Sequence, residues 1–565
     1  MLSLGLTLLF SGTATLASRD TFYPPLNHST FITNTSYGTY GGIYTAPAES
    51  ASSPSADDVY NYCSMPHPRG ETYSLPPPVA NHSIKAKLVY LEYLQRHQRR
   101  TPYNILPGGE NQEYNCDNLD PHVYAAPASQ HPPPVAVYGQ AYSDPTNPYL
   151  TTYVNGSCQY PQLTLGGLLD GYEHGRDLRA VYGRRLGLIP SNPDQKKVWF
   201  RSSSSTLTQG SAGAVLRGLW PEYHEPIPVH QQASAVDTVN RGFPCSARNT
   251  LLSAIQSTAE WNEHLTVTQA LRDKLATMFD AQDESAWTSN FDHFADNFQA
   301  RLCNGYRLPC RVQDRTQCVA AAEADEVFRA GDWEYNYIWR RSANATRYIQ
   351  VIEGLFIGEI VRKLEAVAEG ASKLVYSHNF VHDGDISPIL GALGITVMRW
   401  PGMGSNIAFE VWKTSTSEYF ARVLYSGHAI ETIHGRLDWI PLSKLVDILR
   451  PFIPEDIKSI YRAFPLHRAG LHSLSDESLA THLNSAAVLY DLGQMTVVRL
   501  SKDLGLKGGG NMLPCEAEVL RIVASKPGIR APRVHRSFQV ADDKRHSGTM
   551  DYIVMDYINI RSTSR

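Results

Sequence analysis

The sequence of 565 residues lacks the features that mark several large classes of protein. It has no basic excess of the kind that nucleic-acid-binding proteins usually carry, because 51 Lys and Arg residues face 55 Asp and Glu residues. It has no Cys-x-x-Cys pair, which argues against a structural zinc site. Its best later apolar run, 348–361, is interrupted by Glu353 and Glu359 and is too short to span a bilayer. We therefore expect no nucleic-acid partner, no membrane span and no structural zinc site.

What is present is typical of a secreted protein. A leucine-rich run at residues 2–10 precedes Thr15 and Ala17, which suit a cleavage site, so residues 1–18 are predicted to be a signal peptide. Seven of the eight cysteines precede residue 320, and most should pair in an oxidising compartment, with a connectivity that the sequence leaves open. Cys303, Cys310 and Cys318 are predicted to staple a local loop. Five glycosylation sequons also fall within the first 350 residues, at Asn27, Asn34, Asn81, Asn155 and Asn344.

Hydrophobic patterns divide the chain into segments of different character. Residues 19–82 are rich in Pro, Ser and Thr and are predicted to form an extended, glycosylated lead-in. Strand patterns occur at 87–94, 197–200, 373–380, 407–413 and 418–425, and helical patterns at 168–186, 211–219, 247–280, 320–332 and 349–368. This alternation predicts an α/β core at 83–455, with a helical lobe at about 247–345 inserted between core strands. Residues 456–479 are predicted to be a linker.

Two short motifs follow predicted strands and carry side chains suited to phosphate chemistry. The first strand runs into RHQRRTP at 96–102, and the strand at 373–380 runs into His382 and Asp383. Arginines can bind phosphate oxygens through paired hydrogen bonds, and a histidine between them can attack phosphorus. A second histidine can hold a phosphoryl oxygen while an adjacent carboxylic acid protonates the leaving group. Each motif alone also fits an ordinary strand end, and Asp385 fits either an electrostatic role or a helix start.

In this order the motifs resemble the signature of the histidine acid phosphatases, branch 2 of the histidine phosphatase superfamily, which includes phytases. That signature is RHGxRxP after the first strand and HD late in the chain, represented here at 96–102 and 382–383. The segments 162–175 and 198–212 match two further ordered features of the family. The resemblance covers roughly residues 60–455. It implies an α/β fold, the phosphoglycerate-mutase-like three-layer sandwich with a helical cap domain.

The resemblance also assigns roles to residues of this chain. His97 would be the nucleophile that forms a phosphohistidine, and Asp383 would donate a proton to the leaving group. The phosphate would be bound by Arg96, Arg100, His382 and Arg201. The substrate would be a small-molecule phosphomonoester, hydrolysed without a metal or other cofactor because the arginines supply the positive charge. The oligomeric state is left open.

Two positions depart from the family pattern. Gln98 replaces the signature glycine, which is expected to place a bulky side chain close to the phosphate pocket. Leu207 replaces a third phosphate-binding arginine, a charge-assisted contact of about 1.5–3 kcal/mol for which Arg99 or Arg201 could substitute. The sequence therefore predicts a secreted acid phosphatase whose activity these departures could reduce. It leaves open an alternative, a catalytically weak or inactive binding or interaction protein that keeps the phosphatase fold.

Residues 480–565 do not continue the phosphatase pattern. The segments 497–504, 529–534 and 552–557 resemble strands in the small lobe of aminoglycoside-phosphotransferase-like kinases. Lys507 would hold the nucleotide phosphates, and Glu516, at the start of a helix at 515–525, would be its ion-pair partner. The sequence ends before a catalytic-loop or metal-binding aspartate appears. We therefore predict a truncated small lobe, a fusion or remnant without kinase activity.

Overall fold

The computed structural model describes Tyr23 and much of the chain from residue 62 to residue 557. Within that range, the residues not described are 111, 121–137, 143, 145, 148–155, 242, 244, 455–474, 482, 484–486, 492–494, 501–503, 510–514, 527–530 and 542–548. The predicted signal peptide, most of the predicted lead-in and most of the predicted linker lie outside the described residues, as do the sequons at Asn27, Asn34 and Asn155.

A mixed sheet with the strand order β2-β3-β1-β4-β5-β6 forms the centre of the first part of the chain, and β9 also pairs with β5. Three strands are parallel, β2 (Val198–Ser202), β3 (Tyr376–Val381) and β1 (Ala86–Arg96). β4 (Asn406–Thr414) and β5 (Tyr419–Tyr425) continue the sheet in antiparallel pairing. The short strands of this sheet are β6 (His428–Ala429) and β9 (Ile440–Pro441), while β7 (Glu431–Thr432) and β8 (Gly435–Arg436) pair with each other in a separate two-stranded sheet. Because β1 and β3 are parallel neighbours, the residues that follow them emerge at the same edge of the sheet.

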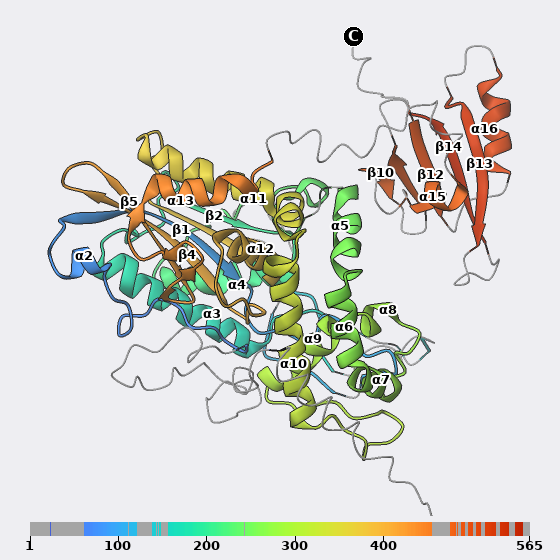
Figure 1. Ribbon diagram of the computed structural model, residues 1–565, viewed down its shortest axis with the longest axis horizontal. Coiled ribbons are helices and arrows are strands. Elements are labelled where there is room, and N and C mark those ends of the chain that lie inside the picture. Colours follow the sequence, from blue (N-terminus) through green and yellow to red (C-terminus); the bar gives the residue numbers. More distant parts are fainter. Residues whose placement is uncertain are drawn as a thin grey trace, which may run out of the picture.

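Helices cover both faces of this sheet (Figure 1). Side chains of β1 alternate between two hydrophobic cores, Leu91 and Tyr93 on one face and Tyr90 and Leu94 on the other. The first face packs against α3 (Leu165–Leu178), its π-helical continuation η5 (Arg179–Arg185) and α4 (Thr206–Leu219). The second face packs against α11 (Ala345–Ala368), α12 (Asp383–Leu393) and α13 (Leu442–Leu449). The predicted three-layer sandwich is confirmed.

Glycines explain why α3 fits so closely against its neighbours. A methyl group at Gly167 would overlap the carbonyl oxygen of Arg99, and one at Gly175 would overlap that of Val215 on α4. From the other helix, a methyl group at Gly218 would overlap the carbonyl oxygen of Tyr172. The glycines matched in the sequence at 162–175 therefore bring α3 against α4 and against the loop that follows β1.

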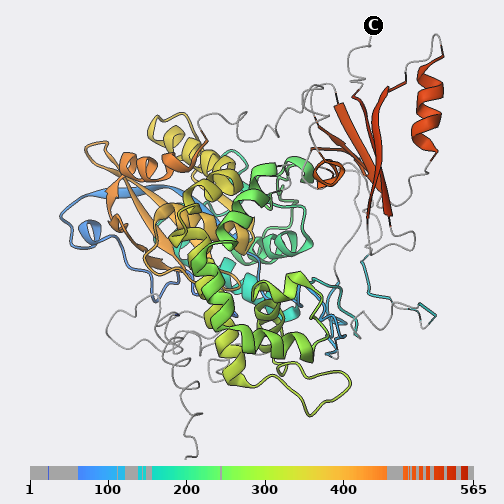
Figure 2. The ribbon, with the colours of Figure 1, turned by 45° about the vertical axis from the view of Figure 1, so that its right-hand side comes forward.

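A group of helices lies beside the sheet layers in both ribbon views (Figure 2). Its members are α5 (Ser246–Gln256), α6 (Ala259–Val267), α7 (Gln269–Met278), α8 (Ser285–Thr288), α9 (Asp292–Cys303), α10 (Ala321–Asn336) and η7 (Tyr337–Arg341). The helical character predicted for 247–345 is confirmed, although the pattern at 247–280 is broken into three helices near Thr258 and Thr268. Short elements elsewhere are α2 (Pro77–Ala80), η6 (Ser234–Val236) and η8 (Arg450–Phe452). The boundaries of the predicted domains stay predictions.

Six of the eight cysteines form three disulfides. The pairs are Cys63–Cys303, Cys116–Cys158 and Cys310–Cys318, while Cys245 and Cys515 are free thiols. The predicted local staple is therefore right for Cys310 and Cys318 but wrong for Cys303, which pairs 240 residues away in the sequence. That pairing ties the segment before β1 to the end of α9. Among the helices that the structure describes, none combines the length and the apolar character needed to cross a membrane.

The C-terminal part contains a second sheet, antiparallel, with the order β10-β11-β12-β14-β13. Its elements are α15 (Asp476–Thr481), β10 (Ala487–Asp491), β11 (Met495–Arg499), β12 (Leu504–Gly509), α16 (Glu516–Ala524), β13 (Val534–Ala541) and β14 (Thr549–Asp556). It has a hydrophobic core of its own. Lys507 on β12 forms an ion pair with Glu516, the first residue of α16. The kinase resemblance is not confirmed, and the nucleotide contacts of these two residues stay a prediction.

Three histidines are buried where β1 and β3 meet α3. The ring of His67 stacks on that of His174 at 3.9 Å between ring centroids. His174 Nε2 lies 2.7 Å from the hydroxyl of Tyr93, and His378 Nδ1 lies 2.6 Å from that of Tyr376. Burial lowers the pKa of all three histidines well below the usual value. They are therefore neutral in the folded protein under conditions in which an exposed histidine is already charged.

This histidine cluster makes the free energy of unfolding depend on pH. Below about pH 6.5 the unfolded chain binds protons that the folded chain does not, so stability is present above that pH and is lost as the pH falls. We expect His378→Gln to flatten this dependence by up to about 1.4 kcal/mol per pH unit, measured by urea unfolding between about pH 5 and 7. The same change at the exposed His224 is the control and should leave the slope unaltered. Parallel slopes for His378→Gln and the unsubstituted protein would contradict the prediction.

Candidate active site

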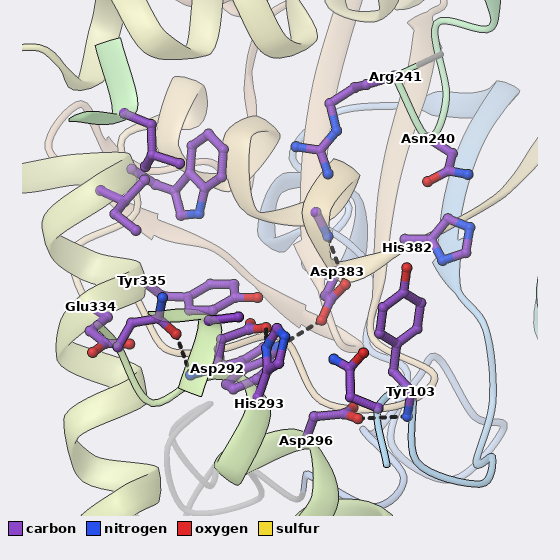
Figure 3. A pocket seen from close by; sticks show the side chains of 18 of the residues that line it. Tyr103, Asn240, Arg241, Asp292, His293, Asp296, Glu334, Tyr335, His382 and Asp383 are labelled. Atoms are coloured by element: carbon purple, nitrogen blue, oxygen red, sulfur yellow. Dashed lines mark hydrogen bonds and ion pairs between the residues drawn. The ribbon is translucent and has the colours of Figure 1, made fainter. Parts of the chain in front are cut away.

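The two phosphate motifs meet at the carboxyl end of the parallel strands. His97 follows β1 directly, and its backbone NH donates a hydrogen bond to the carbonyl oxygen of Val381, the last residue of β3, at 3.0 Å. His382 follows β3 and precedes α12, so the centroids of the His97 and His382 rings lie 5.4 Å apart. Both rings, together with Arg100 and Asp383, line a cavity of about 600 Å³. Figure 3 shows this cavity with His382 and Asp383 labelled. The strand register therefore brings together four of the predicted site residues.

The environment of His97 favours a nucleophile. Nδ1 lies 2.9 Å from the carbonyl oxygen of Gln98, which can only accept a hydrogen bond, so Nδ1 carries the proton and Nε2 keeps its lone pair. Burial, together with the positive charges of Arg96 and Arg100, lowers the pKa of His97 well below its usual value. The imidazole therefore remains neutral, and able to attack, in acidic solution.

Asp383 is held as a carboxylate before any phosphate binds. Its Oδ2 lies 2.9 Å from Arg96 Nη2 and accepts a hydrogen bond from the indole NH of Trp400 at 2.7 Å. Burial favours the neutral acid, but Arg96 and Trp400 outweigh that effect and hold the pKa of Asp383 below its usual value. A bound phosphate would add negative charge beside this carboxylate, and that charge would raise its affinity for a proton.

Arg100 reaches the cavity with one side of its guanidinium group already fixed. Nη2 lies 2.7 Å from Asp296 Oδ1 on α9, and Nη1 donates to the carbonyl oxygen of Thr101 at 2.9 Å. The other oxygen of Asp296 accepts the backbone NH of Tyr103 at 2.7 Å, a contact drawn in Figure 3. Asp296 therefore orients both the arginine and the loop after β1, and it links the sheet edge to the helical region.

His382 and Asp385 are coupled at the start of α12. Asp385 Oδ2 accepts the backbone NH of His382 at 2.8 Å, so the side chain of Asp385 caps the helix. Of the two interpretations open for Asp385, this geometry supports the helix-start role. His382 Nε2 lies 3.2 Å from the hydroxyl of Ser203, which fixes the orientation of its ring.

Arg96 is fully buried and does not line the cavity. Its Nη1 donates to the carbonyl oxygen of Pro401 at 2.5 Å, and its Nη2 faces Asp383. The structure thus shows Arg96 as the partner of the predicted proton donor. Its predicted contact with phosphate stays a prediction.

Arg201 and Arg99, which could have substituted for the arginine missing at 207, are both engaged elsewhere. Arg201 is 2% exposed, and its Nη1 and Nη2 lie 2.5 Å from Glu359 and 2.7 Å from Asp237. Arg99 forms two hydrogen bonds to Asp170, at 2.6 and 3.0 Å. Neither arginine lines the cavity. The structure therefore does not bring either arginine into the cavity beside Leu207, and the phosphate contact of Arg201 stays a prediction.

The side chain of Gln98 does not crowd the phosphate site, contrary to our expectation. It is buried and lies outside the cavity lining. A methyl group at Gly404, which has φ 70°, would lie 2.5 Å from Gln98 Oε1, and the Gln98 side chain also lies near Gly171. These two glycines leave the space that the larger side chain fills. Leu207, by contrast, does line the cavity and offers no charge there.

A family model described as the histidine phosphatase superfamily (branch 2) matches residues 87–426. The chain belongs to this family. It is 25% identical to mouse 2-phosphoxylose phosphatase 1 over 398 residues, which cover 66% of this chain and 77% of the mouse protein. It is 24% identical to counting factor 60 of Dictyostelium discoideum over 294 residues, covering 50% of this chain and 67% of that protein.

Solved structures of phytases resemble this branch 2 histidine phosphatase more distantly. The Hafnia alvei phytase is 14% identical, with a TM-score of 0.44, and the similarity covers 66% of this chain and 98% of the phytase. The phytase of Klebsiella sp. ASR1 is 14% identical, with a TM-score of 0.42 and the same coverage. Within the described residues of our phosphatase, no group of three or more His, Cys, Asp or Glu side chains is placed to hold a metal ion.

Three side chains of the site carry no motif that sequence reasoning could use. Asp296 lies on α9, while Trp400 and Arg241 lie on loops, and all three reach the cavity from far along the chain. Only their position in the folded phosphatase links them to His97 and Asp383. Asp296 falls in the predicted helical lobe, where nothing in the helical pattern distinguishes it from other acidic residues.

Proposed function

We propose that this phosphatase hydrolyses phosphomonoesters through a phosphohistidine formed on His97. The observation that carries the proposal is the neutral imidazole of His97, with its proton on Nδ1, in one cavity with Asp383 and Arg100. The family model and the phosphatase relatives support the reaction class. The arrangement offers a nucleophile, a proton donor and a fixed positive charge, which are the groups that phosphoryl transfer requires.

The reaction then proceeds in two balanced steps. In the first, Nε2 of His97 attacks phosphorus, the bond from phosphorus to the ester oxygen breaks, and Asp383 gives its proton to the departing oxygen. In the second, water attacks the phosphohistidine, the bond from phosphorus to nitrogen breaks, and Asp383 takes up a proton of that water. Breaking of that bond returns His97 to its neutral form. Arg100 and His382 hold the phosphoryl oxygens in both steps.

The charges of the cavity lining favour a substrate with one phosphate on an uncharged body. The lining contains two arginines, Arg100 and Arg241, no lysine, and several carboxylates, while aromatic and amide side chains make up much of the rest. A molecule with many phosphates would meet these carboxylates unfavourably. The mouse relative is named a 2-phosphoxylose phosphatase. We therefore place a sugar monophosphate ahead of phytate among substrates of this chain.

Activity is expected at acidic pH. His97 stays neutral there, the phosphate monoester carries a single charge below about pH 6, and Asp383 gains its proton once phosphate binds. With p-nitrophenyl phosphate and the full chain, kcat/KM should remain high well below pH 6.5, because the lowered pKa of His97 moves the acid limb down. In the same assay, a sugar monophosphate should exceed phytate in kcat/KM.

Two outcomes would contradict this proposal. An acid limb near pH 6.5 would show that His97 titrates as an ordinary histidine. Turnover no higher than that of a His97→Ala control would remove the enzyme function and favour the second interpretation, a binding or interaction protein with the phosphatase fold.

The three disulfides fit passage through an oxidising compartment. Secretion and glycosylation stay predictions.

A further inference from the structure

Arg241 is a charged side chain in the cavity that has no assigned role. It lines the same cavity as His97, His382 and Asp383, and Figure 3 shows its guanidinium group directed toward the start of α12. The structure gives this guanidinium no hydrogen bond and no ion pair to any described residue. Burial opposes its charge, but nearby Asp385 and Glu353 raise the pKa of Arg241 above its usual value. The guanidinium is therefore charged, and its donors remain available to a ligand.

The backbone that presents Arg241 is strained. Asn240 and Arg241 have φ values of 59° and 42°, a left-handed conformation that arginine rarely adopts. A residue of α12 stabilises this turn: the backbone NH of Asn240 donates a hydrogen bond to Asp385 Oδ1 at 3.0 Å. Asp385 also caps α12 through the NH of His382, so one carboxylate fixes the Arg241 turn relative to the catalytic helix start. Strain of this kind persists where the surrounding structure enforces it, often at functional sites.

Arg201 holds the other end of the same loop. Its Nη2 lies 2.7 Å from Asp237 Oδ1, and that oxygen also accepts the backbone NH of Val239 at 3.0 Å. Nη2 further donates to the hydroxyl of Thr238 at 2.8 Å. Arg201, a predicted phosphate ligand, thus fixes Asp237 and Thr238, the residues of the loop that shortly precede the turn at Asn240 and Arg241.

Gly384 leaves space for Arg241. A methyl group at Gly384 would overlap Arg241 Nη2, and the other atoms nearest to that methyl position also belong to Arg241. Gly384 is the residue directly after Asp383. The guanidinium therefore lies against the backbone of the proton donor's neighbour, and a side chain at 384 would displace it.

We propose that Arg241 binds the substrate phosphate and supplies the positive charge that position 207 lacks. Leu207 and Arg241 line the same cavity, and Arg99 and Arg201 are held outside it by Asp170 and Asp237. Arg201 is then a positioning residue that acts through the loop from 237 to 241. This assignment rests on the proposed phosphatase function, since it gives Arg241 a role in that same site.

Inorganic phosphate is the direct probe of this assignment. Arg241→Ala should weaken phosphate binding, measured by calorimetry on the full chain, and lower kcat/KM for p-nitrophenyl phosphate, each by about 10- to 100-fold. Arg241→Lys should recover part of the loss, because it restores the charge without the paired donors. Arg217→Ala, an exposed arginine on α4, is the matched control and should change neither value. Thermal unfolding of each variant shows whether the fold is retained.

Gly384→Ala tests the geometry independently of removing the charge. In the unsubstituted chain it should displace Arg241 and weaken phosphate binding, whereas in the Arg241→Ala background it should have little further effect. Arg201→Gln should likewise weaken binding only while Arg241 is present. Additive losses in these pairs would contradict the proposed contact.

The two proposals fail in different ways. If the unsubstituted chain turns over substrate and Arg241→Ala binds phosphate equally well, the role of Arg241 is overturned while the phosphatase function stands. If the chain binds phosphate through Arg241 but shows no turnover, the function fails and the phosphate site remains. If the unsubstituted chain neither binds phosphate nor turns over substrate, both are overturned.

Discussion

Replacing His97 with alanine is expected to lower kcat for p-nitrophenyl phosphate by at least about 10⁴-fold. The reason is that His97 is the proposed nucleophile of the first step, with its proton on Nδ1 and the lone pair of Nε2 free for attack. The ring of His382, 5.4 Å away, is engaged with Ser203. The measurement is steady-state turnover at acidic pH, with the full chain and its His97→Ala variant prepared in parallel.

The His97→Ala variant has two internal checks. It should still bind inorganic phosphate, because Arg100 and His382 remain, and it should keep the thermal stability of the unsubstituted protein to within the effect of one buried side chain. Free imidazole added to the variant should restore part of the turnover by filling the space of the lost ring. His224→Ala, an exposed histidine far from the strand ends in sequence, should retain full activity. A His97→Ala variant with more than a tenth of the original kcat would contradict the account.

Replacing Asp383 with asparagine is expected to have the second-largest effect. For an alkyl or sugar phosphate, kcat should fall by about 10²- to 10⁴-fold, because the departing alkoxide then receives no proton. For p-nitrophenyl phosphate the first step should fall much less, since p-nitrophenolate leaves without protonation. Stopped-flow measurement of p-nitrophenolate release, beside steady-state turnover of the sugar phosphate, separates the two cases.

The comparison of leaving groups is the control for Asp383→Asn. Asparagine can keep a hydrogen-bonding contact with Trp400, but it loses the ion pair with Arg96. If the substitution only disturbed the structure of the site, the rate of the first step would fall equally for both substrates. Equal losses in the first step for both leaving groups would contradict the assignment of Asp383 as proton donor.

The central part of the site could be predicted because it follows from strand pairing. Buried apolar runs identify β1 and β3, and parallel neighbours place their following residues at one edge. The family resemblance selects His97 and His382, and the observed pairing of β1 with β3 brings them together. The alternation of strands and helices likewise predicts the three layers. These features depend on local sequence patterns and on one topological rule.

The rest of the site depends on contacts that no local pattern encodes. Gln98 was expected to crowd the phosphate, but the space beside Gly171 and Gly404, remote in sequence, accepts its side chain. Arg201 was expected to bind phosphate, but Asp237 and Glu359 hold it beneath the loop. Each outcome is decided by partners more than 30 residues away in the sequence, so the charge of a side chain alone could not predict its role.

Arg241 is a residue of the cavity that the sequence alone did not predict. The family pattern predicts an arginine at 207, and the chain has leucine there. Arg241 reaches the cavity instead, from a turn in which its φ is 42°, and Gly384 leaves the space that its guanidinium group occupies. Comparing position 207 with the family pattern shows that a positive charge is missing there. Only the folded structure shows that Arg241 brings a positive charge into the same cavity.

The most direct test of the central claim is the detection of the phosphohistidine itself. The Asp383→Asn variant should form the intermediate rapidly from p-nitrophenyl phosphate and hydrolyse it slowly, because its second step lacks a base for water. After quenching in alkaline denaturant, which preserves phosphohistidine, peptide mass spectrometry should find one phosphoryl group on His97 and none in the His97→Ala, Asp383→Asn double variant. A phosphoryl group on another residue, or p-nitrophenolate release without any phosphorylated peptide, would contradict the account.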